Sequence, residues 1–192
     1  MSETIVITGK DTRLSYTQVT KVGKLSGKYE TTLLIPKSDK STYNKLLAAI
    51  EAAKEEAKVK RWKGVVPKKF KYEFLQDGDE KLDKDGEPDE NYAGHWYLVA
   101  KAKADTDKVT KVVTPYLPFL CDKNRVKIEP NQVYSGCYGI ASINVYGYEW
   151  EGTKGISAEW RGFQFLRDGE PLGGGGGNAA NDFEEFDDEE AI

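Results

Sequence analysis

The sequence predicts a mainly β fold: an antiparallel barrel with one long inserted α-helix, followed by a disordered acidic C-terminal tail. Three observations lead to this prediction. Short segments rich in β-branched and aromatic residues recur between turn residues, a single stretch has helical periodicity, and the last twelve residues contain few side chains that could build a core. The chain has 192 residues, enough for one domain with a core and a tail.

The first half of the chain contains two predicted strands and the predicted helix. Residues 13–22 and 28–35 are strand-like and are separated by the turn-prone GKLSG. From about residue 38 to residue 60, apolar side chains recur every three or four positions, which predicts a helix with one apolar face. Ser38 or Ser41 is the expected N-cap, with Asp39 favourable in the first turn.

The second half is dominated by predicted strands. An acidic loop spans 77–90, a strand follows over 95–104, and VTPYLPFLCDKN is expected to be an irregular connection because it contains two prolines. Residues 133–150 and 154–166 predict a long hairpin. Five or six strands with one helix favour a small curved barrel, for which the OB-fold is the leading candidate. This divides the chain into an OB-fold domain at 1–172, a Gly-rich linker at 173–180 and an acidic tail at 181–192.

Composition argues against catalysis and against a membrane span. His95 is the only histidine, so a His-based metal cluster is excluded, and we expect no enzymatic activity, metal or cofactor. No apolar run reaches membrane-spanning length, and the N-terminus lacks the pattern of a signal peptide, so we expect the protein in the cytoplasm. Cys121 and Cys137 form no CxxC pattern and are expected to be free buried thiols.

The charge is unevenly distributed. The net charge is −4, but seven of the 32 acidic residues lie in the last twelve positions. Residues 1–180 therefore hold 28 basic against 25 acidic residues, a net charge of +3. From Lys54 to Lys71 the chain has eight basic and two acidic residues, with Trp62 and Phe70 among them. Basic side chains interleaved with aromatic rings suit a single-stranded nucleic acid, although a solvated helix end would have a similar composition.

Strand alternation places further aromatic residues on an outer face. In YGIASINVYGYEW the set from Gly139 to Gly147 is small or apolar and is the better core face, which turns the tyrosines outward. In HWYLVAKAKA the same alternation places Trp96 and Leu98 inward and Tyr97 outward, together with Val99, Lys101 and Lys103. Such a face suits stacking on bases, and it would equally suit a protein partner.

Several segments resemble a phage family of single-stranded-DNA-binding proteins. The most specific are VYSGCYG, GTKGIS and RDGEPLGG, and LIPKSD, AAIEAAKEEAK and YAGHWYLVAKAK also match the family pattern, so the likeness covers most of residues 5–175. The resemblance implies an OB-fold, coating of single-stranded DNA without sequence preference during phage replication or recombination, and no enzymatic activity. It does not indicate which rings touch DNA.

The candidate site therefore rests on the strand faces and the basic segment. The residues expected to stack on bases are Trp62, Tyr97, Tyr138, Tyr146, Tyr148 and Trp150. The residues expected to bind phosphates are Lys58, Lys60, Arg61, Lys63, Lys68, Lys69, Lys101 and Lys103. The alternative is a non-enzymatic phage interaction or scaffold protein whose aromatic face binds protein; a homodimer is also expected.

The acidic tail is expected to imitate DNA. Its acids compete for lysines and arginines, its two phenylalanines occupy base positions, and the freed tail recruits replication or recombination proteins. An inert solubilising tail is the other interpretation. The residues concerned are Asp182, Phe183, Glu184, Glu185, Phe186, Asp187, Asp188, Glu189 and Glu190.

Overall fold

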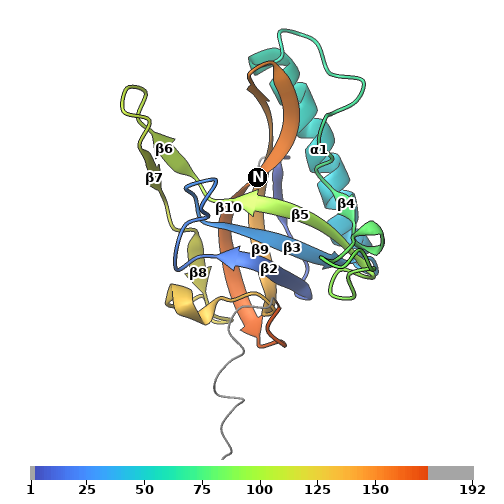
Figure 1. The fold of residues 1–192 in the computed structure, drawn as a ribbon, viewed down its shortest axis with the longest axis vertical. Helices are drawn as coiled ribbons and strands as arrows, with labels where there is room; N and C mark the ends of the chain where they lie inside the picture. The colour runs from blue at the N-terminus through green and yellow to red at the C-terminus, as the bar shows by residue number, and fades with distance from the viewer. Residues whose placement is uncertain (1–2, 173–192) are drawn as a thin grey trace, which may run out of the picture.

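A ring of five paired strands forms the centre of residues 3–172, the part of the chain that this computed structural model describes (Figure 1). The ring runs β2–β3–β5–β10–β9 and closes where β9 pairs with β2. Its neighbours are antiparallel except β5 and β10, which are parallel. The strands are β2 Thr12–Gln18, β3 Glu30–Pro36, β5 His95–Lys101, β9 Tyr138–Trp150 and β10 Thr153–Arg167. This connectivity is that of an OB-fold, so the predicted fold class is confirmed.

Short elements extend the ring. β1 (Ile5–Ile7) pairs with β9, β4 (Gln76–Asp77) with β5, and β8 (Phe119–Cys121) with β10. Short 3₁₀ turns lie at Gly78–Glu80 (η1) and Pro130–Gln132 (η2). The segment predicted to be an irregular connection contains β7 and β8, because its prolines stand at the end of one strand and just before the next. β7 (Val113–Pro115) pairs with β6 (Ala104–Thr106) in a ribbon that projects from the ring (Figure 1).

The helix α1 spans Lys40–Lys60, close to the predicted range. Its N-cap is Asp39 rather than either serine, and the Asp39 carboxylate accepts a hydrogen bond from the Thr42 N–H at 3.0 Å. The buried face contains Leu46, Ala49 and Ala53, which belong to the same core cluster as the inner face of β9. None of the helices described within residues 3–172 is long and apolar enough to cross a membrane.

The core follows the predicted alternation along β9. The inner set from Gly139 to Gly147 is buried at every second position, and the residues between are partly exposed. Cys121 and Cys137 are free and buried, as predicted, and burial raises the pKa of Cys137 to about 11. The linker and acidic tail predicted at 173–192 lie outside the described residues.

Candidate nucleic-acid interface

A groove of about 900 Å³ lies on the outer face of the ring; we call it the main groove. One wall is the loop between β2 and β3, and the opposite wall is the outer half of the β9–β10 hairpin. OB-folds bind oligonucleotides and oligosaccharides between these same loops and across the adjacent strands. The groove is lined by Leu25, Ser26, Lys28, Tyr72, Glu73, Phe74, Gln76, Val99, Lys101, Tyr146, Tyr148, Trp150, Ile156 and Ser157.

The floor follows from strand register. Tyr146 pairs with Ser157 and Tyr148 with Gly155, so both tyrosines share the outer face with small residues of β10. A Cβ on Gly155 would lie 2.5 Å from the Tyr148 ring, so this ring lies directly over the glycine. Trp150, at the end of β9, is 71% exposed. The structure therefore brings together three of the predicted stacking residues, Tyr146, Tyr148 and Trp150.

Trp62 corrects the sequence interpretation. Its exposed fraction is 0%, so the prediction that its ring stacks on bases is wrong. The ring packs beneath Gly147, where a Cβ would lie 2.8 Å from it, and its Nε1–H donates to the Tyr148 carbonyl at 2.9 Å. Trp62 follows the last turn of α1, and it therefore fixes the helix end to the hairpin that holds the tyrosines.

Lys154 makes the same attachment from the hairpin side. Its Nζ donates to the carbonyls of Trp62 and Val65, each at 3.2 Å. The outer part of the hairpin is a two-stranded ribbon, which is marginally stable alone. Figure 1 shows this part running beside the C-terminal end of α1, which supports it.

The predicted phosphate-binding residues fall into different surroundings. Lys101 lines the main groove, with Lys28 from the β2–β3 loop. Lys58 and Lys60 are ion-paired to Glu55 and Glu56 on the same helix face, at 3.8 and 3.4 Å. The remaining predicted residues have no ion pair within residues 3–172; they are Arg61, Lys63, Lys68, Lys69, Lys101 and Lys103. The same is true of Lys28.

Two predicted stacking rings lie away from the groove floor. Tyr97 is half-buried, its hydroxyl donates to Gln76 at 2.8 Å, and its ring packs edge-on against Tyr92. Burial raises the pKa of Tyr97, and the nearby Glu73 carboxylate adds to the effect. Tyr138 lies eight positions from Tyr146 along β9, a separation of about 27 Å. Neither ring lines the main groove, and their roles stay predictions.

Sequence reasoning identified the basic segment up to Lys71 but missed the aromatic residues that follow it. Tyr72 and Phe74 line the groove from residues 66–75, which we call the strap. The alternation of Phe70, Tyr72 and Phe74 with Lys69, Lys71 and Glu73 was a usable signal, because the aromatic residues continue at every second position beyond Lys71. Leu25 was also missed, since a turn has no periodicity that would indicate its contacts, and Lys28 was predicted at the start of a strand but lies in the loop before β3.

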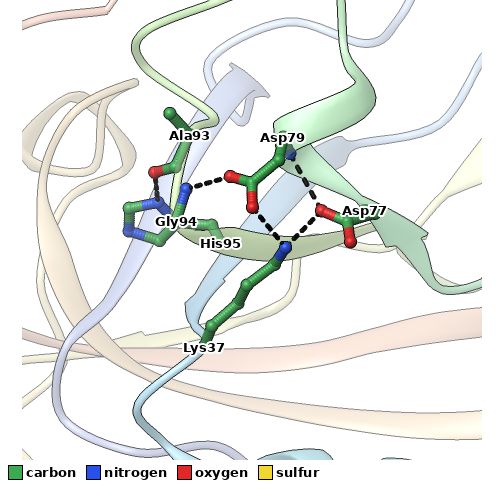
Figure 2. Close-up of polar contacts among 6 residues, drawn as sticks. All are labelled: Lys37, Asp77, Asp79, Ala93, Gly94 and His95. Atoms are coloured by element: carbon green, nitrogen blue, oxygen red, sulfur yellow. Dashed lines mark hydrogen bonds and ion pairs between the residues drawn. The ribbon is translucent and has the colours of Figure 1, made fainter.

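A polar cluster fixes the C-terminal end of the strap (Figure 2). Lys37 Nζ contacts Asp77 at 2.5 Å and Asp79 at 2.6 Å, and Asp79 accepts from the Gly94 N–H at 2.6 Å. The same ammonium lies 4.8 Å from the centre of the Trp96 ring. We call these contacts the Lys37 cluster; they join β3, β4 and the start of β5.

The acids of this region do not form a metal site. Within residues 3–172 no group of three or more His, Cys, Asp or Glu side chains could hold a metal ion. The carboxylates of Asp77 and Asp79 are both ion-paired with the Lys37 ammonium. The Nδ1 atom of His95 lies 2.8 Å from the Ala93 carbonyl oxygen (Figure 2). The cluster is therefore a structural contact.

The five-strand ring and its connectivity place the chain among OB-fold proteins, and its groove carries exposed aromatic side chains together with Lys28 and Lys101, which have no ion pair within residues 3–172. The chain belongs to the family described as "Enterobacter phage Enc34, ssDNA-binding protein", whose sequence model matches residues 4–192. The p50 protein of Acyrthosiphon pisum secondary endosymbiont phage 1 is 33% identical over 189 residues, covering 92% of this chain and 89% of the relative. The resemblance to a phage single-stranded-DNA-binding family is thereby confirmed.

Solved structures share the fold. The single-stranded DNA-binding protein of bacteriophage Enc34 superposes with a TM-score of 0.66 at 22% identity, covering 94% of this chain and 90% of that one. The same protein in complex with ssDNA superposes with a TM-score of 0.64 at 24% identity, covering 88% of this chain and 90% of that one. Gp2.5, the single-stranded DNA-binding protein of bacteriophage T7, gives 0.59 at 18% identity, covering 94% and 95%.

Proposed function

We propose that this protein binds single-stranded DNA without sequence preference and that the main groove is its binding site. The observation that carries the proposal is the convergence of Tyr146, Tyr148 and Trp150 with Lys28 and Lys101 in one open groove, where neither lysine has an ion pair within residues 3–172. The relative from bacteriophage Enc34, which has the same fold, has been solved with single-stranded DNA, and this supports the assignment.

The chemistry explains the preference for single strands. An exposed ring can stack on any unpaired base, because every base has a π-face, and each engaged ring contributes about 1–3 kcal/mol. The lysines neutralise phosphates and release counterions, which makes affinity fall with salt. Paired bases in a duplex are already stacked on one another, so the rings gain nothing from them.

We further propose that the protein protects single strands during phage DNA replication or recombination in the host cytoplasm, without enzymatic activity. The acidic residues 182–190 would compete with DNA for the lysines and, when displaced, recruit partner proteins. A homodimer is part of the proposal, since twofold dimers are the commonest symmetric oligomers.

The test is a gel shift with single- and double-stranded DNA, combined with tryptophan fluorescence on adding poly(dT). We expect preferential binding of the single strand, quenching of Trp150, and a log–log salt slope of about −0.7 per phosphate neutralised. Equal affinity for duplex and single strand, or a flat salt response, contradicts the proposal. Absence of quenching favours the alternative of a protein-binding scaffold.

The tail is tested by a variant that ends at Gly175. Its affinity for single-stranded DNA should exceed that of the full chain, most clearly at low salt, because the competing carboxylates are gone. Unchanged affinity indicates an inert tail. Sedimentation velocity on the full chain tests the dimer, which a single monomer peak at all concentrations contradicts.

A further inference from the structure

A second groove of about 790 Å³ lies on the other side of the strap. It is lined by Tyr43, Leu47, Ile50, Lys54, Lys69, Phe70, Lys71, Tyr72, Glu73, Phe74, Leu75, Trp96 and Ile156. Tyr72, Glu73 and Phe74 also line the main groove, and so does the buried Ile156 of β10. The two grooves are therefore neighbours on one surface, and the strap is the wall between them.

The strap is held by contacts at its ends and by apolar side chains that pack against the core, namely Val66, Phe70, Phe74 and Leu75. Lys154 fixes the chain at Trp62 and Val65, and β4 with the Lys37 cluster fixes it after Leu75. Within the described part of the chain, no backbone–backbone hydrogen bond holds residues 66–74. In the middle, Phe70 packs against Trp62, with ring centres 5.7 Å apart. Within residues 3–172 the N–H groups of 66–74 (except Pro67) therefore have no backbone partner.

Residues 69–72 of the strap alternate between basic and aromatic side chains, and the exposed Glu73 is the acidic residue of the wall. Lys69, Lys71 and Tyr72 are exposed, and Lys71 Nζ lies 5.1 Å from the centre of the Tyr72 ring. Unlike Lys54, which is paired with Glu51 at 2.6 Å, neither Lys69 nor Lys71 has an ion pair within residues 3–172. Two free ammonium groups beside an exposed ring match the repeat of phosphate and base along a single strand.

We propose that the second groove continues the single-strand path: DNA leaves the main groove across the strap, with Lys69 and Lys71 on its phosphates and Tyr72 beneath a base. This inference rests on the proposed function, because it extends the same ligand into a second site. The shared wall favours one ligand over two, and Lys69 and Lys71, which have no ion pair within residues 3–172, favour a nucleic acid over an apolar peptide.

The experiment compares a short strand, which fits one groove, with a long strand, which spans both. Binding of fluorescent oligothymidylates of about 5 and about 16 nucleotides is measured, lengths that bracket the sites of single OB-folds. The variant is Lys69→Glu/Lys71→Glu in the full chain, and Leu47→Glu introduces a carboxylate on the helix side of the same groove, at a residue that is 42% exposed. The control is Lys123→Glu/Lys127→Glu, which makes the same charge change at exposed residues outside both grooves.

We expect the double variant to lose about 25-fold in affinity for the long strand at 0.1 M salt, with the slope reduced by about 1.4, as for two lost phosphate contacts. Leu47→Glu should lose about fivefold in affinity for the long strand. Both variants should bind the short strand as the control does. Equal losses for both lengths, or no loss for the long one, overturn the proposal; the second result assigns the groove to a protein partner. If the unmodified chain binds neither strand, the proposed function itself fails.

Discussion

The two ends of β9 carry similar chemistry in the sequence, and the structure gives them different surroundings. At the first end, the guanidinium carbons of Arg13 and Arg167 lie 5.2 and 3.7 Å from the centre of the Tyr138 ring. Arg13 donates to the carbonyls of Gly136 and Glu170, and Arg167 donates to Asp11. At the other end, Tyr146 and Tyr148 border an open groove in which Lys101 has no ion pair within residues 3–172.

The difference shows that residue type does not by itself identify a binding surface. Arginine beside tyrosine at the first end is already satisfied by carbonyls and a carboxylate, so a ligand would have to displace those contacts. At the other end, the Lys101 ammonium beside Tyr146 and Tyr148 has no ion pair within residues 3–172, so its N–H donors can bind a ligand without displacing a carboxylate. The proposed binding site therefore lies at the groove end of β9, and we expect the contacts at the Tyr138 end to be structural.

The largest expected effect concerns the support of the groove end. Trp62→Ala removes a ring with 0% exposure and the bond to Tyr148, and we expect a loss of about 3–5 kcal/mol in the free energy of unfolding. Trp150→Ala removes an exposed ring, so its unfolding free energy should change by no more than about 0.5 kcal/mol. Urea unfolding followed by circular dichroism measures both, and equal losses would show that the groove end does not depend on the helix.

The next effect separates the two ends of β9 directly. Tyr148→Ala should weaken binding of single-stranded oligothymidylate by about 1–3 kcal/mol, or about 5- to 150-fold, because a stacking platform is lost. Tyr138→Ala should leave the affinity within about twofold, because its ring is engaged by two arginines far from the groove. Fluorescence anisotropy titrations at one salt concentration provide the comparison. An equal loss in both variants would place DNA along the whole strand.

A smaller effect distinguishes paired from unpaired lysines. Lys28→Ala and Lys101→Ala should each reduce the slope of log affinity against log salt by about 0.7, since each loses one phosphate contact. Lys58→Ala and Lys60→Ala should leave the slope unchanged, because Glu55 and Glu56 lie beside these lysines and repel phosphate. Titrations between 50 and 300 mM salt test both pairs. Equal slope changes would indicate that the helix lysines exchange their carboxylates for DNA.

The sequence predicted the elements whose pattern is periodic. The β9 alternation identified the core face and the tyrosine face, and the helix appeared at the expected residues. It failed where position depends on contacts far along the chain: Trp62 lies in a basic segment, yet it is buried because Gly147, 85 positions away, leaves room for its ring. The β6–β7 ribbon was missed because its strands are too short to leave a periodic signal. In the strap, the basic segment was recognised up to Lys71, but Tyr72 and Phe74 beyond it were not.

The smallest expected effect concerns how the far end of the strap is held. The Lys37 ammonium and the Asp79 N–H hold the pKa of the Asp77 carboxyl below its ordinary value, and the Gly94 N–H and Lys37 do so for Asp79. A carboxyl whose pKa is lowered on folding stabilises the fold above its unfolded pKa of about 3.9, and this contribution is lost as the pH falls through the lower folded value. Asp77→Asn should therefore be less stable than the parent chain at pH 7, and the difference should shrink below about pH 4.

Urea unfolding at pH 7 and pH 3 tests this dependence, with Glu90→Gln as the control, since Glu90 is exposed and has no ion pair within residues 3–172. Taking the difference between parent and variant removes the titration of the other carboxylates. A difference that is the same at both pH values would mean that Asp77 acts only through its hydrogen bond to the Asp79 N–H, which asparagine can also accept. The strap end would then be held by backbone pairing of β4 with β5 rather than by the charge of the Lys37 cluster.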